Sequence, residues 1–269
     1  MSVVHTWDKS VKLQIEDCAK KPFSIRLCAA IFLAGQVWLH CIQGKICRRF
    51  IIEHMVTVGP GSISPVLLVN CFAGMIFTIQ TGRELVRFGA VNNVGGAFAL
   101  AFCRELAPIL TASIIAGQVG SAFAAEIGAM QVTEQIDALH MLKTDPIDYL
   151  VIPRVIACCV MVPALTVFGL VIGIVGGAIA AFEFYKMSPD IFLESVRKFL
   201  TASDLLIVVF KGFIFGVMVA IIGCSWGLTT RGGVKEIGKS ATAAVVTTWI
   251  AIFMLDLFLS LALFEKPVF

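Results

Sequence analysis

Five long apolar stretches constrain this chain more than any other feature of its sequence. They cover roughly residues 65–82, 93–123, 150–182, 203–228 and 240–264. A helix needs about 20 apolar residues to cross the hydrocarbon core of a bilayer, and each stretch is close to or above that length. We therefore predict an all-α membrane protein with five transmembrane helices.

The composition supports the same class. Hydrophobic residues make up 58% of the chain and charged residues 14%, whereas an average soluble domain is about 25% charged. The formal net charge of +3 is small and spread along the chain, so nucleic acid is not predicted as a partner. The nine cysteines include no CxxC pair, and neither a disulfide framework nor a metal site is predicted.

The first 60 residues are predicted to form an N-terminal region that precedes a five-span domain at 61–269. Within it, residues 23–43 are apolar but carry Arg26, Gln36 and His40. This segment fits either a sixth span or an amphipathic helix that lies in the membrane interface, and we favour the interfacial helix. The run Gly59–Pro65 is rich in glycine and proline and predicts a break.

A polar segment at 126–148 separates the second and third apolar stretches. Its acidic residues have a single basic neighbour, Lys143, and they are Glu126, Glu134, Asp137, Asp145 and Asp148. At helical spacing Val132, Ile136 and Leu139 share one face and the central acidic residues another, and Pro146 ends the helix. Two interpretations remain: a helix on the membrane surface that contacts a soluble partner, or an ordinary solvated loop helix.

The distribution of basic residues favours one orientation. With five spans and an inside N-terminus, the larger share of Lys and Arg falls on the cytoplasmic side, as the positive-inside rule expects. The N-terminus and residues 126–148 are then both cytoplasmic. On the other side, residues 188–198 predict a short amphipathic surface helix, with Ser188 as the N-cap and Pro189 at its first position.

Small residues recur at helix-packing spacing on two neighbouring spans. Glycines four residues apart allow two helix backbones to approach closely. The positions are Gly169, Gly173 and Gly177 on the third span, and Gly212/Gly216 and Gly223/Gly227 on the fourth.

Four ionisable residues interrupt the apolar stretches: Arg104, Glu105, Lys211 and Asp256. Each costs about 2.5–3.5 kcal/mol at the centre of a membrane helix, so they should be paired or face water. In the five-span topology all lie about 12–17 Å below the outer surface at about 1.5 Å per residue. We predict one cluster of zero net charge. It serves either as buried ion pairs that fix helix register or as a polar floor beneath a cavity that opens outward.

Pro108 affects the backbone hydrogen bonding near Arg104. Pro108 lies one turn after Arg104 and has no backbone N–H. A backbone carbonyl near Arg104 should therefore be available to another donor.

Residues Gly233–Ser240 match the nucleotide-binding pattern GxxxxGK[ST]. A working phosphate-binding loop needs a preceding strand in a soluble parallel sheet, and no stretch between the fourth and fifth spans is long enough for one. We interpret the match as a chance one in a basic cytoplasmic turn. No other catalytic pattern is present, so the chain is not predicted to be an enzyme.

Several runs of this sequence resemble the MlaE family. They are Thr81-Gly-Arg-Glu-Leu-Val-Arg-Phe-Gly-Ala90, Arg104-Glu-Leu-Ala-Pro-Ile-Leu-Thr-Ala112, Glu126-Ile-Gly-Ala-Met-Gln-Val-Thr-Glu-Gln-Ile-Asp-Ala-Leu139, Asp145-Pro146 and Pro153-Arg154. The resemblance extends from about residue 50 to the C-terminus. Members of this family are permease subunits of ABC transporters that move phospholipids between membranes of Gram-negative bacteria and plastids.

The resemblance implies a homodimer of five-span subunits in a bacterial inner membrane or plastid inner envelope. It also implies an MCE-domain protein outside the membrane and a separate ATPase subunit that holds the ATP and Mg, with no cofactor on this chain. The family's coupling helix matches Glu126–Leu142. The residues expected to contact the ATPase are Glu126, Met130, Glu134, Gln135 and Asp137, and those expected to bind substrate are Arg104, Glu105, Lys211 and Asp256.

Two other functions remain as alternatives. An ion- or proton-coupled secondary transporter would use Glu105, Lys211 and Asp256 as a relay and would need no partner. A membrane scaffold that transports nothing would use the same charges only for stability.

Overall fold

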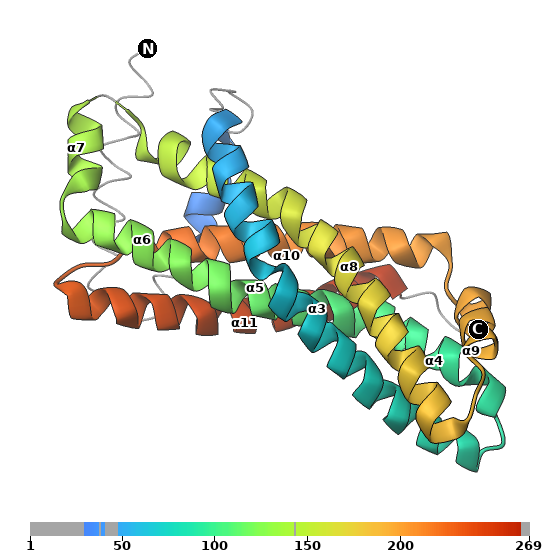
Figure 1. Ribbon diagram of the computed structural model, residues 1–269. Coiled ribbons are helices and arrows are strands. Elements are labelled where there is room, and N and C mark those ends of the chain that lie inside the picture. The colour runs from blue at the N-terminus through green and yellow to red at the C-terminus, as the bar shows by residue number, and fades with distance from the viewer. Residues whose placement is uncertain (1–29, 38, 41–47, 143, 265–269) are drawn as a thin grey trace. The chain divides into compact units, whose positions relative to one another are not determined.

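The computed structural model describes residues 30–37, 39–40, 48–142 and 144–264, and all regular secondary structure in them is helical (Figure 1). The long α-helices are α3 (Arg48–Arg87), α8 (Ile152–Tyr185), α10 (Ala202–Leu228) and α11 (Val234–Phe264). The shorter ones are α4 (Val94–Ala101), α5 (Ala107–Ile115), α6 (Ser121–Val132), α7 (Gln135–Met141) and α9 (Pro189–Phe199). A 3-10 helix, η1 (Val91–Asn93), and three π-helices, η2 (Phe102–Leu106), η3 (Ala116–Gly120) and η4 (Ile147–Val151), complete the elements described from residue 48 onward.

The chain packs as two compact units, each described by itself. The first unit comprises Met1–His54, Ala116–Ala157 and Val217–Trp249. The second unit comprises Met55–Ile115, Cys158–Gly216 and Ile250–Phe269.

Five segments of the described chain are long and apolar enough to cross a membrane. They are Arg49–Arg87, Val91–Val132, Ile147–Tyr185, Ala202–Leu228 and Val234–Leu263. The predicted all-α class and the five spans are thus confirmed for the described residues. Of the apolar N-terminal segment, residues 30–37 and 39–40 are described and helical. The interfacial location of residues 23–43 stays a prediction.

The predicted break at Gly59–Pro65 is wrong, because this run lies inside α3. Val58 and Val66, the residues on either side of the run, are fully buried, and the side chain of Met161 fills the space beside Gly59. Packing against a neighbouring helix therefore keeps the segment helical, and membrane helices tolerate proline where their surroundings satisfy the freed backbone groups. The domain boundary expected at residue 60 falls within this helix.

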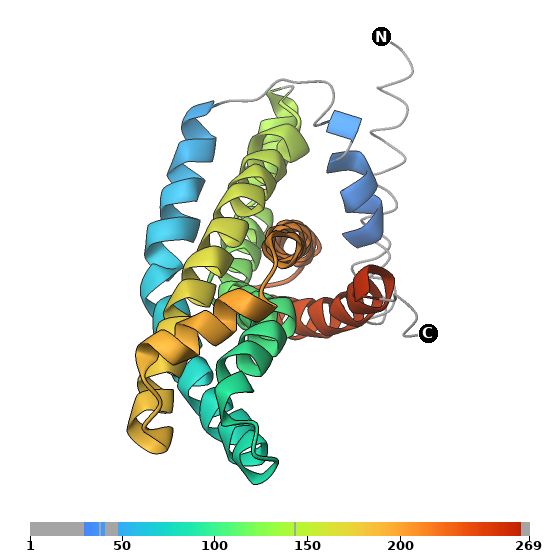
Figure 2. The same ribbon diagram turned by 90° about the vertical axis from the view of Figure 1, so that its right-hand side faces the viewer.

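In the second unit, α4 and α9 lie side by side (Figure 2). The ring of Phe98 is 5.2 Å from that of Phe102 and 5.9 Å from that of Phe192, measured between centroids, and all three residues are fully buried. The Ser195 hydroxyl accepts a hydrogen bond of 2.9 Å from the Gly96 backbone N–H. The amphipathic helix predicted at 188–198 is confirmed as α9, with Ser188 as N-cap and a proline in the first turn.

The glycines predicted to permit close helix packing do so. A side chain at Gly173 would collide with the ring of Phe102, and one at Gly74 of α3 would collide with the Gly173 backbone. On α10, Gly216 lies against the Cys158 carbonyl in the second unit. Close backbone approach, which the small-residue spacing indicated, is therefore real in this unit.

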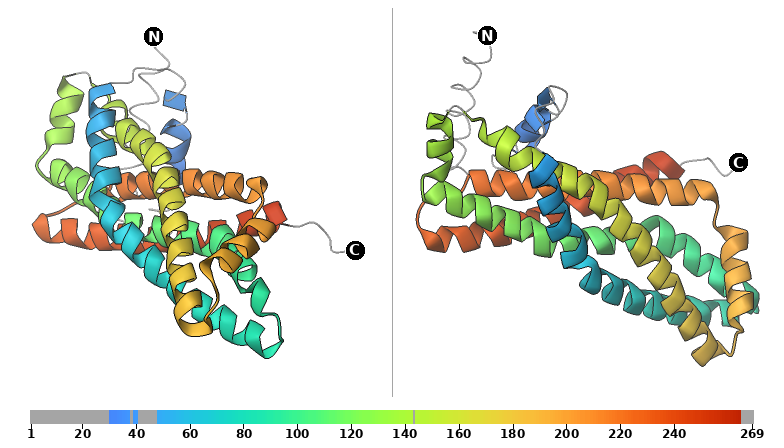
Figure 3. Two further views of the ribbon diagram at one scale, coloured as in Figure 1. Left: turned by 45° about the vertical axis from the view of Figure 1, so that its right-hand side comes forward. Right: turned by 45° about the horizontal axis from the view of Figure 1, so that its top comes forward.

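In the first unit, the acidic segment after the second span is not one helix. α6 ends at Val132, Thr133 and Glu134 form a turn, and α7 then leaves in another direction (Figure 3). Glu134 has a positive φ of 59°, and the Thr133 hydroxyl donates to the Ala129 carbonyl at 2.9 Å. The single helix predicted at about 126–142 is therefore two helices, and the expected stop at Pro146 is wrong, since α7 ends at Met141, well before the proline.

The nucleotide-binding look-alike Gly233–Ser240 is helical for most of its length. It contains the first turns of α11, which begins at Val234, and no strand precedes it in the described part of the chain. Lys239 Nζ donates to Glu236 Oε1 at 2.6 Å. The lysine of the pattern thus pairs within its own helix.

Candidate functional site: a buried lysine cluster and an exposed acidic helix

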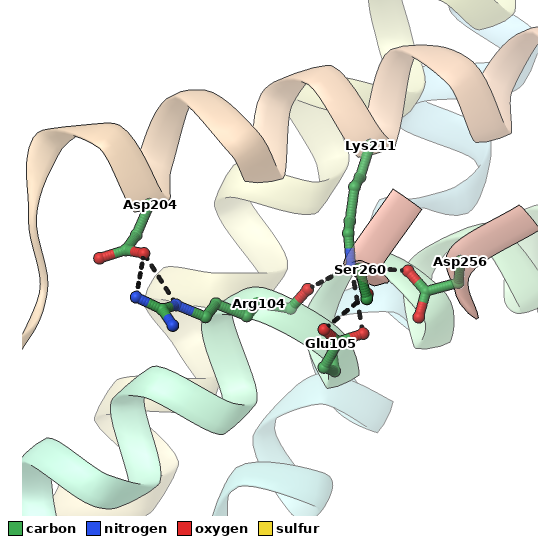
Figure 4. Close-up of polar contacts among 6 residues, drawn as sticks. All are labelled: Arg104, Glu105, Asp204, Lys211, Asp256 and Ser260. Atoms are coloured by element: carbon green, nitrogen blue, oxygen red, sulfur yellow. Dashed lines mark hydrogen bonds and ion pairs between the residues drawn. The ribbon is translucent and has the colours of Figure 1, made fainter. Parts of the chain in front are cut away.

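Lys211 on α10 is the centre of a polar cluster in the second unit (Figure 4). Its side chain is completely buried, and Nζ donates to Ser260 Oγ at 2.8 Å and to Glu105 Oε2 at 3.1 Å. Asp256 Oδ1 lies 2.8 Å from Nζ as an ion pair. Ser260 in turn donates to Glu105 Oε1 at 2.8 Å. The side chains of Glu105, Lys211 and Asp256, expected together from their depth, do meet.

The backbone carbonyl of Arg104 is a further acceptor for Lys211, at 2.8 Å from Nζ. In an α-helix this carbonyl would accept from residue 108, but Pro108 has no N–H to donate. Both Arg104 and Glu105 lie in the π-helix η2, and single π turns within helices are often found at functional sites. The sequence prediction of an available carbonyl beside Arg104 is confirmed.

The guanidinium of Arg104 has a partner that the sequence reasoning missed. Its Nε and Nη2 both lie 2.8 Å from Oδ1 of Asp204, whose side chain is 3% exposed. Asp204 Oδ2 also accepts from the Thr201 backbone N–H at 3.0 Å and from its hydroxyl at 2.7 Å. Asp204 lies in the first turn of α10, where acidic residues are common because they interact favourably with the helix dipole. Its spacing of two turns from Lys211 was the signal available.

Asp204 changes the predicted charge balance. Arg104 and Asp204 form one ion pair, and Lys211 faces two carboxylates, those of Glu105 and Asp256. With every group ionised, these five residues carry a net charge of −1 rather than zero. The expectation of a neutral cluster is therefore wrong for the described residues, because Asp204 was left out of it.

A cavity of about 490 Å³ lies beside this cluster, within the second unit. Leucines and an alanine line most of it, and three polar side chains face it; its lining comprises Leu100, Ala101, Arg104, Glu105, Leu257, Ser260 and Leu261. Arg104 and Glu105 are 36% and 38% exposed, whereas Lys211 is buried behind them. The site therefore offers a cation and an anion at the wall of an apolar cavity, as ligand sites commonly do.

In the first unit, α7 presents polar and apolar side chains together. Glu134, Gln135 and Asp137 are exposed, and Ile136 between them is buried. At the end of the helix Met141 is 85% exposed and Leu142 75%. Exposed apolar side chains beside acidic ones are typical of a protein-interaction surface. The sequence reasoning named the acidic residues but missed these two hydrophobic ones.

The other two residues predicted to contact the ATPase, Glu126 and Met130, lie on α6. Glu126 Oε2 accepts from Arg154 Nη2 at 2.9 Å, and Arg154 also donates to the Leu150 carbonyl at 2.8 Å. The Arg154 guanidinium lies 5.3 Å from the centroid of the Phe123 ring. Met130 is half-buried. Glu126 therefore holds two segments of the first unit together, whatever else it contacts.

Five helical segments that are long and apolar enough to cross a membrane place this chain among the α-helical integral membrane proteins. The family model described as permease MlaE matches residues 51–262, and the chain belongs to that family. It is 55% identical to a probable ABC transporter permease protein of Synechocystis sp., over 89% of this chain and 91% of the relative. It is 44% identical to the Arabidopsis thaliana protein trigalactosyldiacylglycerol 1, chloroplastic, over 87% of this chain and 67% of the relative. A probable ABC transporter permease protein of Pyropia yezoensis is 42% identical over 82% of this chain and 84% of its own length.

Proposed function

We propose that this ABC transporter permease moves phospholipids between membranes and that a separate subunit hydrolyses the ATP. One observation carries the proposal: an apolar cavity of about 490 Å³ has the Arg104 cation and the Glu105 anion at its wall. A phospholipid complements such a cavity, because its acyl chains need an apolar environment and its phosphate needs a cationic partner. The name of the Arabidopsis relative, which contains that of a galactolipid, agrees with a lipid substrate.

The cluster residues divide into two roles in this proposal. Arg104 contacts the lipid phosphate, because its guanidinium is at the cavity wall and can form charge-assisted hydrogen bonds with phosphate oxygens. Asp204 holds that guanidinium in place by accepting from its Nε and Nη2. Lys211 and Asp256, which are almost fully buried, keep Glu105 and the Arg104 backbone in position rather than contact the lipid.

The ATPase binds α7 in this proposal. The acidic side chains of α7 would attract a basic surface of the ATPase, and Met141 and Leu142 would supply the apolar area that becomes buried on binding. Closure of the ATPase pushes on α7, and the motion passes through the turn at residues 144–146 to the helix that follows. Rigid-body motion of helices is a common way to reshape a cavity.

The family context completes the proposal. The permease acts as a homodimer in a bacterial inner membrane or plastid inner envelope, with its N-terminus in the cytoplasm or stroma. An MCE-domain protein on the other side exchanges lipid with the cavity. The neighbouring genes offer a simple test, because an ATPase and an MCE protein encoded beside this chain would agree with it.

One observation favours a second candidate function. Lys211 faces two carboxylates, and an excess carboxylate inside a membrane protein is a possible proton site in a proton-coupled secondary transporter. The chain reconstituted alone decides between the two. Flux driven by a proton gradient without an ATPase would favour the second candidate.

The lipid site is tested by cross-linking. A photoactivatable phospholipid is added to proteoliposomes that contain the wild-type chain or a variant with Arg104→Gln, with Arg197→Gln as a control at an exposed arginine of α9. We expect cross-links to the cavity residues Leu257 and Leu261 to fall at least fivefold in the Arg104 variant only. Equal cross-linking in all three proteins would contradict the proposed headgroup site.

A further inference from the structure

Three side chains of the first unit, from segments more than a hundred residues apart, lie together. His40 Nδ1 is 2.8 Å from Asp148 Oδ1 and 4.0 Å from Asp145 Oδ2. One ligand atom of each residue lies within 4.8 Å of those of the other two. The sequence analysis predicted no metal site, because His40 is more than a hundred residues away from the two carboxylates in the chain.

Asp145 lies just before η4 and Asp148 in its first turn, and local contacts hold this segment in place. Asp145 Oδ1 accepts from the Ile147 backbone N–H at 2.8 Å, and Oδ2 lies 4.0 Å from His40 Nδ1. The Tyr149 N–H donates to the Asp145 carbonyl at 3.1 Å. The Tyr149 ring packs edge-on against Phe50, with 5.0 Å between centroids. Asp145 and Asp148 are therefore presented by a braced turn at the start of η4, and that is how metal ligands are usually oriented.

The separations match those of ligands that share one metal ion. With metal–ligand bonds of about 2.0–2.2 Å and tetrahedral angles, neighbouring ligand atoms are about 3.4 Å apart. His40 Nδ1 and Asp148 Oδ1 share a hydrogen bond of 2.8 Å, and Asp145 Oδ2 lies 4.0 Å from the same nitrogen, so a bound ion would replace the hydrogen bond and bring all three atoms to this spacing. One imidazole nitrogen and two carboxylate oxygens suit Zn²⁺ or Mn²⁺ better than Ca²⁺, which takes six to eight oxygens.

We propose that His40, Asp145 and Asp148 bind a divalent first-row metal ion such as Zn²⁺ or Mn²⁺. The three side chains are 27%, 37% and 33% exposed, so an ion can reach them and solvent can complete its coordination. The ion joins the segment around residue 40 to the turn between α7 and α8. This inference concerns the first unit and does not rest on the proposed lipid transport.

Titration of the whole chain with a single metal tests the site. Full-length protein without a histidine tag is titrated in detergent with Zn²⁺ and, in a separate experiment, with Mn²⁺, and the heat of binding is measured for the wild type, His40→Gln and Asp148→Asn. We expect about one tight site per chain in the wild type and a rise in Kd of at least tenfold in both variants. His140→Gln on α7 is the matched control and should bind as the wild type does.

Two results would overturn the proposal. One is an absence of tight Zn²⁺ and Mn²⁺ binding to the wild-type protein, in which case His40 and Asp148 form an ion pair only. The other is an unchanged Kd in both cluster variants, which would assign any binding to other histidines or cysteines. If the variants fail to fold, X-ray absorption of the Zn²⁺-loaded wild type decides. We expect nitrogen and oxygen neighbours at about 2.0–2.2 Å, and sulfur neighbours would contradict the site.

Discussion

Lys211 and Glu134 show two opposite ways in which this chain places charge. Lys211, in the second unit, is completely buried, and four oxygen atoms from the chain itself surround its ammonium group. Glu134, in the first unit, is exposed on a turn with positive φ, and its carboxylate has no partner among the described residues. The first charge is satisfied within the chain, whereas the second is available to something outside it.

The difference teaches what each region can contribute. A buried charge that is fully paired fixes the positions of its neighbours, and removal of one partner exposes the others to the cost of an uncompensated charge. An exposed charge has little effect on the free energy of unfolding and is available to bind a partner. Substitutions in the cluster should therefore act on stability and substrate, and substitutions on α7 on coupling to a partner.

The largest effect is expected from Lys211→Ala. The change leaves two carboxylates and the Arg104 carbonyl without their shared donor, and we expect the free energy of unfolding to fall by about 3–5 kcal/mol. Denaturant titration of the purified protein, with helicity as the readout, measures the loss. Lys198→Ala on the exposed side of α9 is the control and should change little. A Lys211 variant as stable as the wild type would show that the cluster contributes no stability.

Asp204→Asn should have a smaller effect on stability and a clear one on substrate. The amide oxygen still accepts from one donor, but the ion pair with Arg104 is lost, and we expect a cost of about 1.5–3 kcal/mol. The guanidinium is then no longer fixed, so phospholipid cross-linking at Leu257 should fall several-fold. Asp190→Asn, at an exposed position of α9, controls for a general effect of charge. A stable variant that keeps full cross-linking would remove Asp204 from the site.

Glu126→Ala and Glu134→Ala compare a paired carboxylate with an exposed one in the same unit. Glu126 neutralises the buried Arg154, so its loss should lower the free energy of unfolding by about 1–2 kcal/mol, more than a surface ion pair contributes. The loss of Glu134 should change it by less than about 0.5 kcal/mol. Parallel denaturant titrations measure both. Equal effects would mean that the Glu126–Arg154 contact is unimportant.

The sequence predicted the parts of this structure that follow from hydrophobicity and spacing. The spans follow from hydrophobicity, the cap at Ser188 and the packing of Gly173 from local residue types and spacing, and the meeting of Glu105, Lys211 and Asp256 from their common depth in the membrane. The carbonyl beside Pro108 follows from the missing N–H of proline.

Other features depend on contacts between distant segments, which no local pattern reports. Asp204 looks like a helix-end residue until Arg104 is placed beside it. The prolines of Gly59–Pro65 look like a break until the segment packs on its neighbour. The turn at Glu134 needs a positive φ that glutamate rarely adopts, so helical periodicity alone missed it. His40 reaches two carboxylates only in the folded chain.

The proposed transport mechanism requires that an ATPase binds α7. ATP-driven transfer of phospholipid between proteoliposomes, with the ATPase present, tests it directly. Glu134→Lys should reduce transfer at least tenfold at unchanged stability, while Glu194→Lys on α9 should leave it unchanged. Full transfer by the Glu134→Lys variant, or gradient-driven transport by this chain alone, would contradict the account.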